Sequence, residues 1–217
     1  MVTRIFGPSG NGCVLALTGL PGGGDRIYDR SQFGNHGHVS GSVWVRRRLD
    51  LWCPSFDGVD DYVDVAPTPE INITTGDITI AMWFRADAVD RTCDLLQKGV
   101  GGGSYTIHCD GSNRIVFLKQ ADAASQAVST TQIQAGKWYF VVGQKKAGTG
   151  LLFIDGRLEG TDGTFANFTS KTNLYIGKGD DGKFAGQIAL LRIYNRALSA
   201  LEVQNLYRVE KSLFGMC

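Results

Sequence analysis

The densest group of carboxylates in the sequence lies within residues 55–65, which hold four aspartates: Asp57, Asp60, Asp61 and Asp64. Clustered carboxylates can transfer protons in acid and base catalysis, or they can ligate a hard cation such as Ca²⁺. Asp60 and Asp64 would share one face of an extended strand and Asp61 would point the other way, because side chains alternate along a strand. We therefore interpret the cluster as a solvated sheet rim whose aspartates accept hydrogen bonds from turn amides, with a catalytic pair as the alternative.

The glutamates are too dispersed for catalysis by paired carboxylates. Retaining glycoside hydrolysis requires two carboxyl groups about 5–5.5 Å apart. The sequence contains four glutamates, no two of them within four residues of each other: Glu70, Glu159, Glu202 and Glu210. Glu202 has the position of a helix cap, and Glu159 follows a turn. The sequence therefore predicts a non-catalytic protein.

The three histidines, His36, His38 and His108, lack the Gly-x-Ser-x-Gly turn of a serine hydrolase. His36 and His38 stand in a glycine-rich loop, which we interpret as a surface turn rather than a metal site. Gly99–Gly103 lacks the Lys-Ser/Thr ending of a phosphate-binding loop, so we predict that it is the tip of a hairpin.

The overall composition argues against two classes of partner. The 217 residues are 43% hydrophobic, and 22 Lys and Arg against 21 Asp and Glu leave a net charge of +1. Because such a balance creates no field that attracts nucleic acid or an anionic membrane, we expect neither partner. No run of about 18 apolar residues occurs and the first residues lack the apolar core of a signal peptide, so we expect no membrane insertion and no secretion by that route.

Short segments rich in β-branched and aromatic residues dominate the chain, and many of its 29 glycines separate them. This spacing is typical of an all-β sandwich, and a single domain is favoured at this length. The candidate strands are Val14–Thr18, Val43–Val45, Tyr62–Val65, Ile78–Arg85, Asp94–Lys98, Tyr105–Cys109, Arg114–Leu118, Trp138–Gln144, Leu151–Ile154, Leu174–Gly177 and Gly186–Tyr194.

Two segments have patterns that predict their surroundings. In Ile78–Arg85, Ala81 and Trp83 would face one side of the sheet. The apolar residues between and beside them would face the other side. This pattern is typical of a central strand covered on both faces. Ser199 and Glu202 have the spacing of a capping box, which predicts one short helix. Its apolar stripe would dock on the sandwich through Val203, Leu206 and Tyr207.

We divide the chain into an N-terminal arm at residues 1–12, a β-sandwich domain at residues 13–207 and a C-terminal tail at residues 208–217. The arm is rich in Gly, Ser and Pro. Both terminal segments are expected to lie outside the core, either frayed or held by a neighbouring subunit.

Cys93–Lys98 and Tyr105–Cys109 have the pattern of a hairpin around a glycine-rich tip. This pairing would place Cys93 nearly opposite Cys109, with Cα atoms ~4.5–5.5 Å apart. Two reduced thiols are favoured over a disulfide, because five scattered cysteines do not make a disulfide scaffold.

Four stretches, in this order, resemble the laminin-G-like, or concanavalin A-like, jelly-roll domains. They are Tyr28–Gly37, Ser55–Val65 with Ile78–Phe84, Trp138–Gly143 with Leu151–Gly160, and Phe184–Ser199. The resemblance spans roughly residues 14 to 207, and it rests on the order and spacing of the four stretches. It implies an antiparallel two-sheet jelly-roll sandwich. Independently of the resemblance, Asp155-Gly156 between apolar residues predicts a type I′ hairpin turn.

The resemblance also implies a candidate cofactor, because members of this family often bind one calcium ion at a sandwich edge. By position, Asp29 and Asn35 match residues that contribute oxygen ligands there. The sequence departs from the family pattern in its last strand, where Ala189 and Leu190 replace two acidic residues. Calcium at Asp29 and Asn35 is therefore one expectation, and the absence of any cofactor is the other.

Many relatives bind carbohydrate, which implies a glycan as a ligand. The candidate stacking residues are Trp44, Trp52 and Tyr105, and the candidate polar loop contains Asp180 and Asp181. For each aromatic residue the alternative is a packing role in the core or at its rim.

We therefore expect a non-catalytic binding or decoration module. The expected setting is the surface of a phage-type virion, as a capsid decoration or a tail-associated adhesin that docks on other virion or assembly subunits or on copies of itself. The alternatives are a carbohydrate-binding or glucanase-like protein of a cellular organism, and a purely structural spacer.

Overall fold

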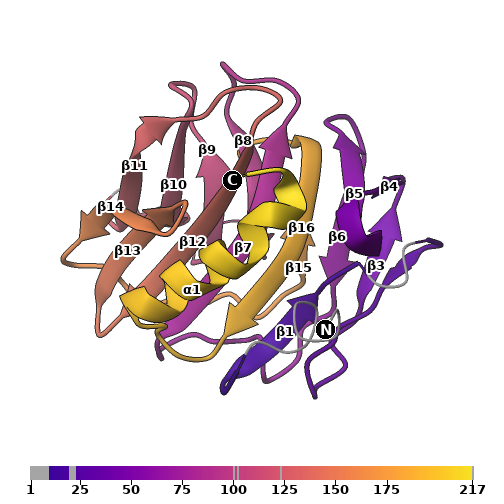
Figure 1. Cartoon of the computed structure of the whole chain (residues 1–217). Helices are drawn as coiled ribbons and strands as arrows, with labels where there is room; N and C mark the ends of the chain where they lie inside the picture. Colours follow the sequence, from indigo (N-terminus) through magenta and orange to yellow (C-terminus); the bar gives the residue numbers. More distant parts are fainter. Residues whose placement is uncertain (1–9, 20–22, 100, 102, 123, 217) are drawn as a thin grey trace.

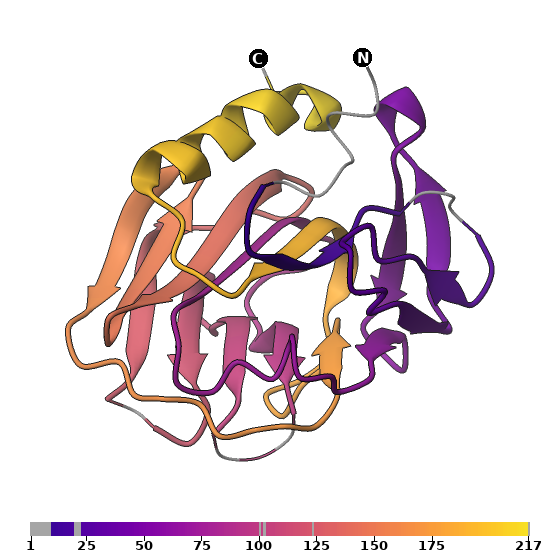
Figure 2. The same cartoon turned by 90° about the horizontal axis from the view of Figure 1, so that it is seen from below.

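A computed structural model describes residues 10–19, 23–99, 101, 103–122 and 124–216, which form two packed β-sheets. Each sheet has eight strands in the described part of the chain, and neighbouring strands run antiparallel. One helix crosses the outer face of one sheet (Figure 1), and a second view shows it lying above that sheet (Figure 2). The structure confirms the predicted all-β antiparallel sandwich with one C-terminal helix.

Sheet A, the sheet under the helix, has the order β14-β13-β12-β7-β16-β5-β4. One half of β16 pairs with β5, and the other half pairs with β1. The strands of sheet A are β1 (Cys13–Leu17), β4 (Val43–Arg46), β5 (Trp52–Asp57), β7 (Ile78–Ala86), β12 (Trp138–Lys146), β13 (Thr149–Ile154), β14 (Arg157–Asp162) and β16 (Ala185–Tyr194).

Sheet B has the order β11-β10-β9-β8-β15-β6-β3-β2. Its strands are β2 (Arg26–Ile27), β3 (Gly37–Ser40), β6 (Tyr62–Val65), β8 (Cys93–Lys98), β9 (Tyr105–Cys109), β10 (Arg114–Lys119), β11 (Gln126–Gln132) and β15 (Leu174–Ile176). The aspartate-rich turn after β5 therefore connects the two sheets. Asp57, the last residue of β5, accepts the backbone N–H of Val59 at 2.7 Å through Oδ1, which confirms that an aspartate of this stretch bonds a turn amide.

Strand β7 lies between β12 and β16 in the interior of sheet A, and an apolar cluster covers each of its two faces. Ile80, Met82 and Phe84 face the interior between the sheets, whereas Ala81 and Trp83 face a second apolar cluster on the helix side of sheet A. All five side chains have no exposed surface. The predicted central strand is confirmed, and two cores explain why its alternation is apolar on both faces.

Helix α1 (Ala200–Glu210) begins with the predicted capping box, in which Ser199 and Glu202 each bond the other's backbone N–H. Its Val203 is buried in the apolar cluster on the helix side of sheet A, and Leu206 and Tyr207 pack against the same cluster. The helix therefore docks through the predicted stripe. No helix in the described ranges is long and apolar enough to cross a membrane.

The prediction that residues 208–217 form a tail outside the core is corrected by the structure. Helix α1 continues to Glu210, and the 3₁₀ helix η3 (Lys211–Phe214) follows directly. Leu213 is only 2% exposed, and the ring centroid of Phe214 lies 4.3 Å from that of Trp83. A second 3₁₀ helix, η2 (Arg48–Asp50), separates β4 from β5. In the predicted N-terminal arm, residues 1–9 lie outside the described residues.

Strand β16 carries a β-bulge at which its register against β7 shifts by one residue between Ala189 and Arg192. Leu190 adopts a φ of 51°, a left-handed conformation that is uncommon for a bulky side chain. Because side chains alternate along a strand, the extra residue turns Arg192 to the helix side of sheet A. There its Nη1 lies 2.8 Å from Oε1 of Glu210, and both side chains are buried.

Two predicted hairpins are confirmed in register and turn geometry. Cys93 pairs directly with Cys109 across β8 and β9. Asp155 and Gly156 have φ values of 49° and 77°, and a type I′ turn requires positive φ at both positions.

We expect Cys93 and Cys109 to resist alkylation in the folded protein. Both are free thiols with exposures of 3% and 2%. Burial raises the pKa of Cys93 to about 11 and that of Cys109 to about 12, so little thiolate exists at neutral pH. Mass spectrometry after iodoacetamide treatment should show labelling at least about tenfold slower than in guanidinium chloride, since labelling requires opening of the hairpin. Equal rates in the two conditions would contradict this expectation.

Candidate functional site

The two tryptophans predicted to stack on sugars lie on the strands β4 and β5 of sheet A. The pairing of Trp44 with Pro54 and of Arg46 with Trp52 places both indoles on the same face of the sheet. Both are half-buried, and Trp44 packs against the interior cluster. The indole N–H of Trp44 also donates to the carbonyl oxygen of Gly24 at 2.8 Å. Trp44 thus has a packing role, and part of Trp52 is accessible.

The prediction that Tyr105 is an exposed stacking residue is wrong. Its side chain is 1% exposed and belongs to the interior cluster. Its ring meets that of Phe168 edge to face, with centroids 5.2 Å apart. Burial also raises the pKa of the Tyr105 hydroxyl. Alternation along β9 turns this residue inward, so it cannot contact a ligand from solvent.

Asp180 and Asp181 are exposed in the loop between β15 and β16. Asp180 Oδ2 accepts hydrogen bonds from the side chain of Gln97 at 2.9 Å and from the backbone N–H of Gly101 at 2.6 Å. Asp181 Oδ2 lies 3.0 Å from Nδ1 of His108. This loop contacts sheet B, whereas Trp44 and Trp52 belong to sheet A, so the structure does not bring the predicted ligand residues together in one site.

Asp29 and Asn35, the predicted calcium ligands, lie together in the loop between β2 and β3. The Asp29 carboxylate accepts N–H bonds from Ala16, Ser31 and Asn35, each at 2.8 Å, and the Ser31 hydroxyl at 2.6 Å. These four donors occupy about as many bonds as a carboxylate accepts. The structure therefore shows Asp29 bracing this loop against β1, and calcium here stays a prediction.

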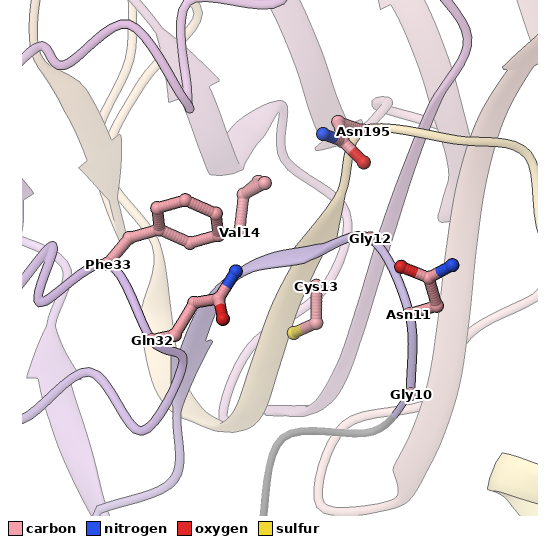
Figure 3. Close-up of a pocket in the computed structure, with 8 residues that line it drawn as sticks. All are labelled: Gly10, Asn11, Gly12, Cys13, Val14, Gln32, Phe33 and Asn195. Carbon is pink, nitrogen blue, oxygen red and sulfur yellow. The ribbon is translucent and has the colours of Figure 1, made fainter.

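A pocket of about 400 Å³ opens beside the braced loop, between the turn before β1, the loop after β2 and the end of β16 (Figure 3). Four of its residues are exposed and converge from these three segments: Asn11, Gln32, Phe33 and Asn195. The remaining lining residues are Gly10, Gly12, Cys13 and Val14. The opening therefore combines one phenyl ring with three carboxamides, and none of the lining residues that the structure describes has an acidic or basic side chain.

Hydrogen bonds hold the walls of this pocket in place. The backbone N–H of Asn195 donates to the carbonyl oxygen of Gly12 at 2.9 Å, which joins the end of β16 to the turn before β1. The side chain of Asn35 donates to the carbonyl oxygen of Val14 at 2.9 Å. Asp29 and Asn35 thus position the loop that presents Phe33.

Comparison with known protein families identifies the architecture that carries this pocket. One family model, Laminin_G_3, described as the concanavalin A-like lectin/glucanases superfamily, matches residues 57–204, which is more than half of the chain. The chain belongs to this superfamily. The match agrees with the sandwich and with the sequence resemblance. Of the residues that line the pocket, only Asn195 lies inside the matched region.

Solved structures of toxin binding domains are similar to this concanavalin A-like domain. The binding domain of Paraclostridial Mosquitocidal Protein 1 matches with a TM-score of 0.77 and 16% identity, over 95% of this chain and 55% of that one. The binding domain of botulinum neurotoxin DC matches in complex with SialylT (TM-score 0.71, 18% identity) and with rat synaptotagmin II (0.73, 16%), each over 92% of this chain and 52% of that one. The chain thus spans about half the length of these structures, and the likeness concerns the fold. No curated protein matches the chain by sequence.

The pocket of this concanavalin A-like domain suits a ligand with both apolar and polar faces. An exposed phenyl ring stacks on flat apolar surface, and a carboxamide both donates and accepts hydrogen bonds. Within the described ranges, the carboxamides of Asn11, Gln32 and Asn195 make no hydrogen bond to other protein groups. They are therefore available to a ligand.

The residues of this pocket are not among those predicted from the sequence. A signal existed at Phe33, which is an aromatic residue in a loop of glycine, serine and asparagine and has no partner in a strand pattern. Asn11 and Asn195 have no comparable signal in the sequence, because they come close to Phe33 only when β1 pairs with β16.

Proposed function

We propose that this concanavalin A-like domain is a non-catalytic module that binds neutral glycans in the pocket beside Phe33. The observation that carries the proposal is the convergence of a 40% exposed phenyl ring with three exposed carboxamides around one concavity. A sugar presents a flat face of C–H groups and a rim of hydroxyls. The C–H face can stack on an aromatic ring. The hydroxyls can pair with carboxamides, which both donate and accept hydrogen bonds.

Charge supports a neutral glycan rather than a sialylated one. Recognition of a carboxylate ordinarily uses an arginine or lysine. Among the described residues, the pocket lining has neither an arginine nor a lysine. Arg196 follows the lining residue Asn195, but its guanidinium is paired with Glu202 at 2.6 Å, which lowers the pKa of that carboxyl to about 2.

The positions of the glutamates support a role without catalysis. Glu70 lies in a loop and is half-exposed. The other three glutamates hold structural contacts, which are Glu159 with Thr131, Glu202 with Arg196 and Glu210 with Arg192. None of these contacts brings a second carboxyl group into the arrangement that glycoside hydrolysis requires.

The similar solved structures are binding domains, which supports a binding role for this chain. The neutral-glycan ligand is inferred from the pocket of this chain alone, because SialylT and rat synaptotagmin II are ligands of the relatives. Display on a virion, docking on other subunits and self-association stay predictions from the sequence.

A glycan array followed by calorimetric titration would test the proposal. We expect neutral oligosaccharides to bind and Phe33→Ala to weaken binding about fivefold to tenfold, because a stacked aromatic ring contributes about 1 kcal/mol or somewhat more. Asn195→Ala should weaken binding about fivefold, since one hydrogen bond contributes about 1 kcal/mol.

Two control variants separate this site from the alternatives. Leu201→Ala removes a 64% exposed side chain from the outer surface of α1 and should leave binding unchanged. Trp52→Ala tests the residue that the sequence predicted. Loss of binding in Trp52→Ala with none in Phe33→Ala would move the site to the edge of sheet A. Absence of binding to any glycan at millimolar concentration would overturn the proposal.

A further inference from the structure

Strands β8 and β9 are neighbours in sheet B (Figure 1). A separate group of polar side chains lies on their outer face. Asp94 of β8 pairs directly with His108 of β9, and Asp181 reaches both from the loop between β15 and β16. Ile107 and Cys109, which flank His108, face the interior, so His108 faces outward. Asp94, His108 and Asp181 are called the sheet B cluster below.

The distances between the ligand atoms of the sheet B cluster are close to those in a metal site. Nδ1 of His108 is 3.0 Å from Oδ2 of Asp181 and 4.0 Å from Oδ1 of Asp94. All three ligand atoms lie within 4.8 Å of one another. A tetrahedral zinc ion about 2.0–2.1 Å from each ligand would place them about 3.3 Å apart. Small side-chain rotations would therefore bring all three to one ion.

Asp94 supplies an independent sign that a ligand belongs here. Its side chain has no exposed surface, and its Oδ2 accepts the backbone N–H of Asp181 at 2.7 Å. Its Oδ1, the atom aimed at His108, has no hydrogen-bond partner in the described structure. A buried carboxylate oxygen without a donor is costly, and burial raises the pKa of Asp94 to about 7. A cation between Oδ1 and His108 would remove that cost.

The loop that carries Asp181 is held tightly over the two strands. The backbone N–H of Asp94 donates to the carbonyl oxygen of Gly182 at 3.2 Å, and the backbone N–H of Asp180 donates to Oε1 of Gln97 at 2.9 Å. A Cβ added to Gly179 would lie 2.5 Å from Oδ2 of Asp94 and 2.5 Å from Oε1 of Gln97. The absence of a side chain at Gly179 thus lets the loop approach Asp94 closely.

We propose that the sheet B cluster binds one divalent cation of the zinc type, with Asp94 Oδ1, His108 Nδ1 and Asp181 Oδ2 as its protein ligands. An imidazole nitrogen with two carboxylate oxygens suits Zn²⁺, whereas Ca²⁺ prefers six to eight oxygen ligands. The side chains of His108 and Asp181 are 12% and 32% exposed, which leaves an open side for entry and for water ligands. The bound ion would tie the β15–β16 loop to β8 and β9.

The full chain, stripped of metal with EDTA and desalted, provides the test. Zn²⁺, Mn²⁺ and Ca²⁺ are added at equal micromolar concentrations, and the melting temperature and the calorimetric stoichiometry are measured. We expect Zn²⁺ to raise the melting temperature with one ion bound per chain, and Ca²⁺ to produce a much smaller shift. His108→Gln and Asp181→Asn should each weaken zinc binding by about tenfold or more.

Two further variants distinguish a metal site from a structural cluster. Asp94→Asn keeps an oxygen for the N–H of Asp181, so it should abolish the zinc-induced shift without lowering the melting temperature of the metal-free protein. His38→Gln is the matched control, because exposed His38 also faces an aspartate, Asp64, at 3.2 Å but has no third ligand among the described residues. It should leave zinc binding unchanged. No zinc-induced shift in the natural chain, or an unchanged shift in Asp94→Asn, would overturn the proposal.

Discussion

Replacing Glu210 with alanine is expected to lower the free energy of unfolding by about 3–5 kcal/mol, because it leaves a buried guanidinium without its carboxylate. Oε1 of Glu210 lies 2.8 Å from Nη1 of Arg192, and Oε2 accepts the indole N–H of Trp83 at 2.8 Å. Arg192 has no exposed surface and Glu210 is 2% exposed, so water cannot replace the lost partner. Guanidinium chloride denaturation followed by tryptophan fluorescence measures the loss.

A double variant tests whether the loss of stability comes from the unpaired charge. Arg192→Met combined with Glu210→Met removes both charges and keeps much of the buried volume, so it should retain most of the stability that Glu210→Ala loses. A loss below about 1 kcal/mol in Glu210→Ala is typical of an exposed ion pair and would contradict the buried arrangement.

Removing Leu213 and Phe214 together, by Leu213→Ala with Phe214→Ala, is expected to lower the free energy of unfolding by about 4 kcal/mol. Leu213 is 2% exposed, and the ring of Phe214 lies 4.3 Å from that of Trp83 and 4.5 Å from that of Trp138. The variant would create a void on the helix side of sheet A and would remove two aromatic contacts. Thermal and chemical denaturation both report the change.

Val209→Ala is the matched control for this second prediction. Val209 lies in the last turn of α1 and is 57% exposed, so its truncation should change stability by no more than about 0.5 kcal/mol. If the double variant behaved like this control, Leu213 and Phe214 would lie outside the core, as the predicted tail at residues 208–217 requires.

The local signals in the sequence predicted those parts of the fold that depend on neighbouring residues. The capping box at Ser199, the turn at Asp155-Gly156 and the pairing of Cys93 with Cys109 are all present in the structure. Each of these features depends on a few residues whose own conformational preferences agree with the final fold.

The strands that the sequence analysis did not predict lack a strong apolar pattern. Strand β11, at the edge of sheet B, reads Gln-Ala-Val-Ser-Thr-Thr-Gln. Its two buried residues, Ala127 and Ser129, alternate with less buried ones, and only one of the two is apolar. Strand β5 contains Pro54, which argues against a strand because it cannot donate a ladder hydrogen bond. The C-terminal turn was missed because Leu213 and Phe214 are too few to show a periodicity.

The candidate site was only partly predictable. The sequence pointed to the loop of Asp29 and Asn35, and the structure assigns those residues to bracing the loop that presents Phe33. Tyr105 was assigned to the surface because a strand pattern alone does not say which of its two faces is inside. That choice depends on which sheet packs against the strand.

By itself, the sequence determined the fold class, the superfamily and the apolar character of both faces of β7, because turns, caps and alternation are encoded within short segments. Only the tertiary structure decided which distant side chains meet. A one-residue bulge at Leu190 turns Arg192 toward Glu210, and the loop before β16 brings Asp181 to Asp94. Such contacts depend on strand order and register. Both are set by the packing of the two cores together, so a single segment of the sequence gives little sign of them.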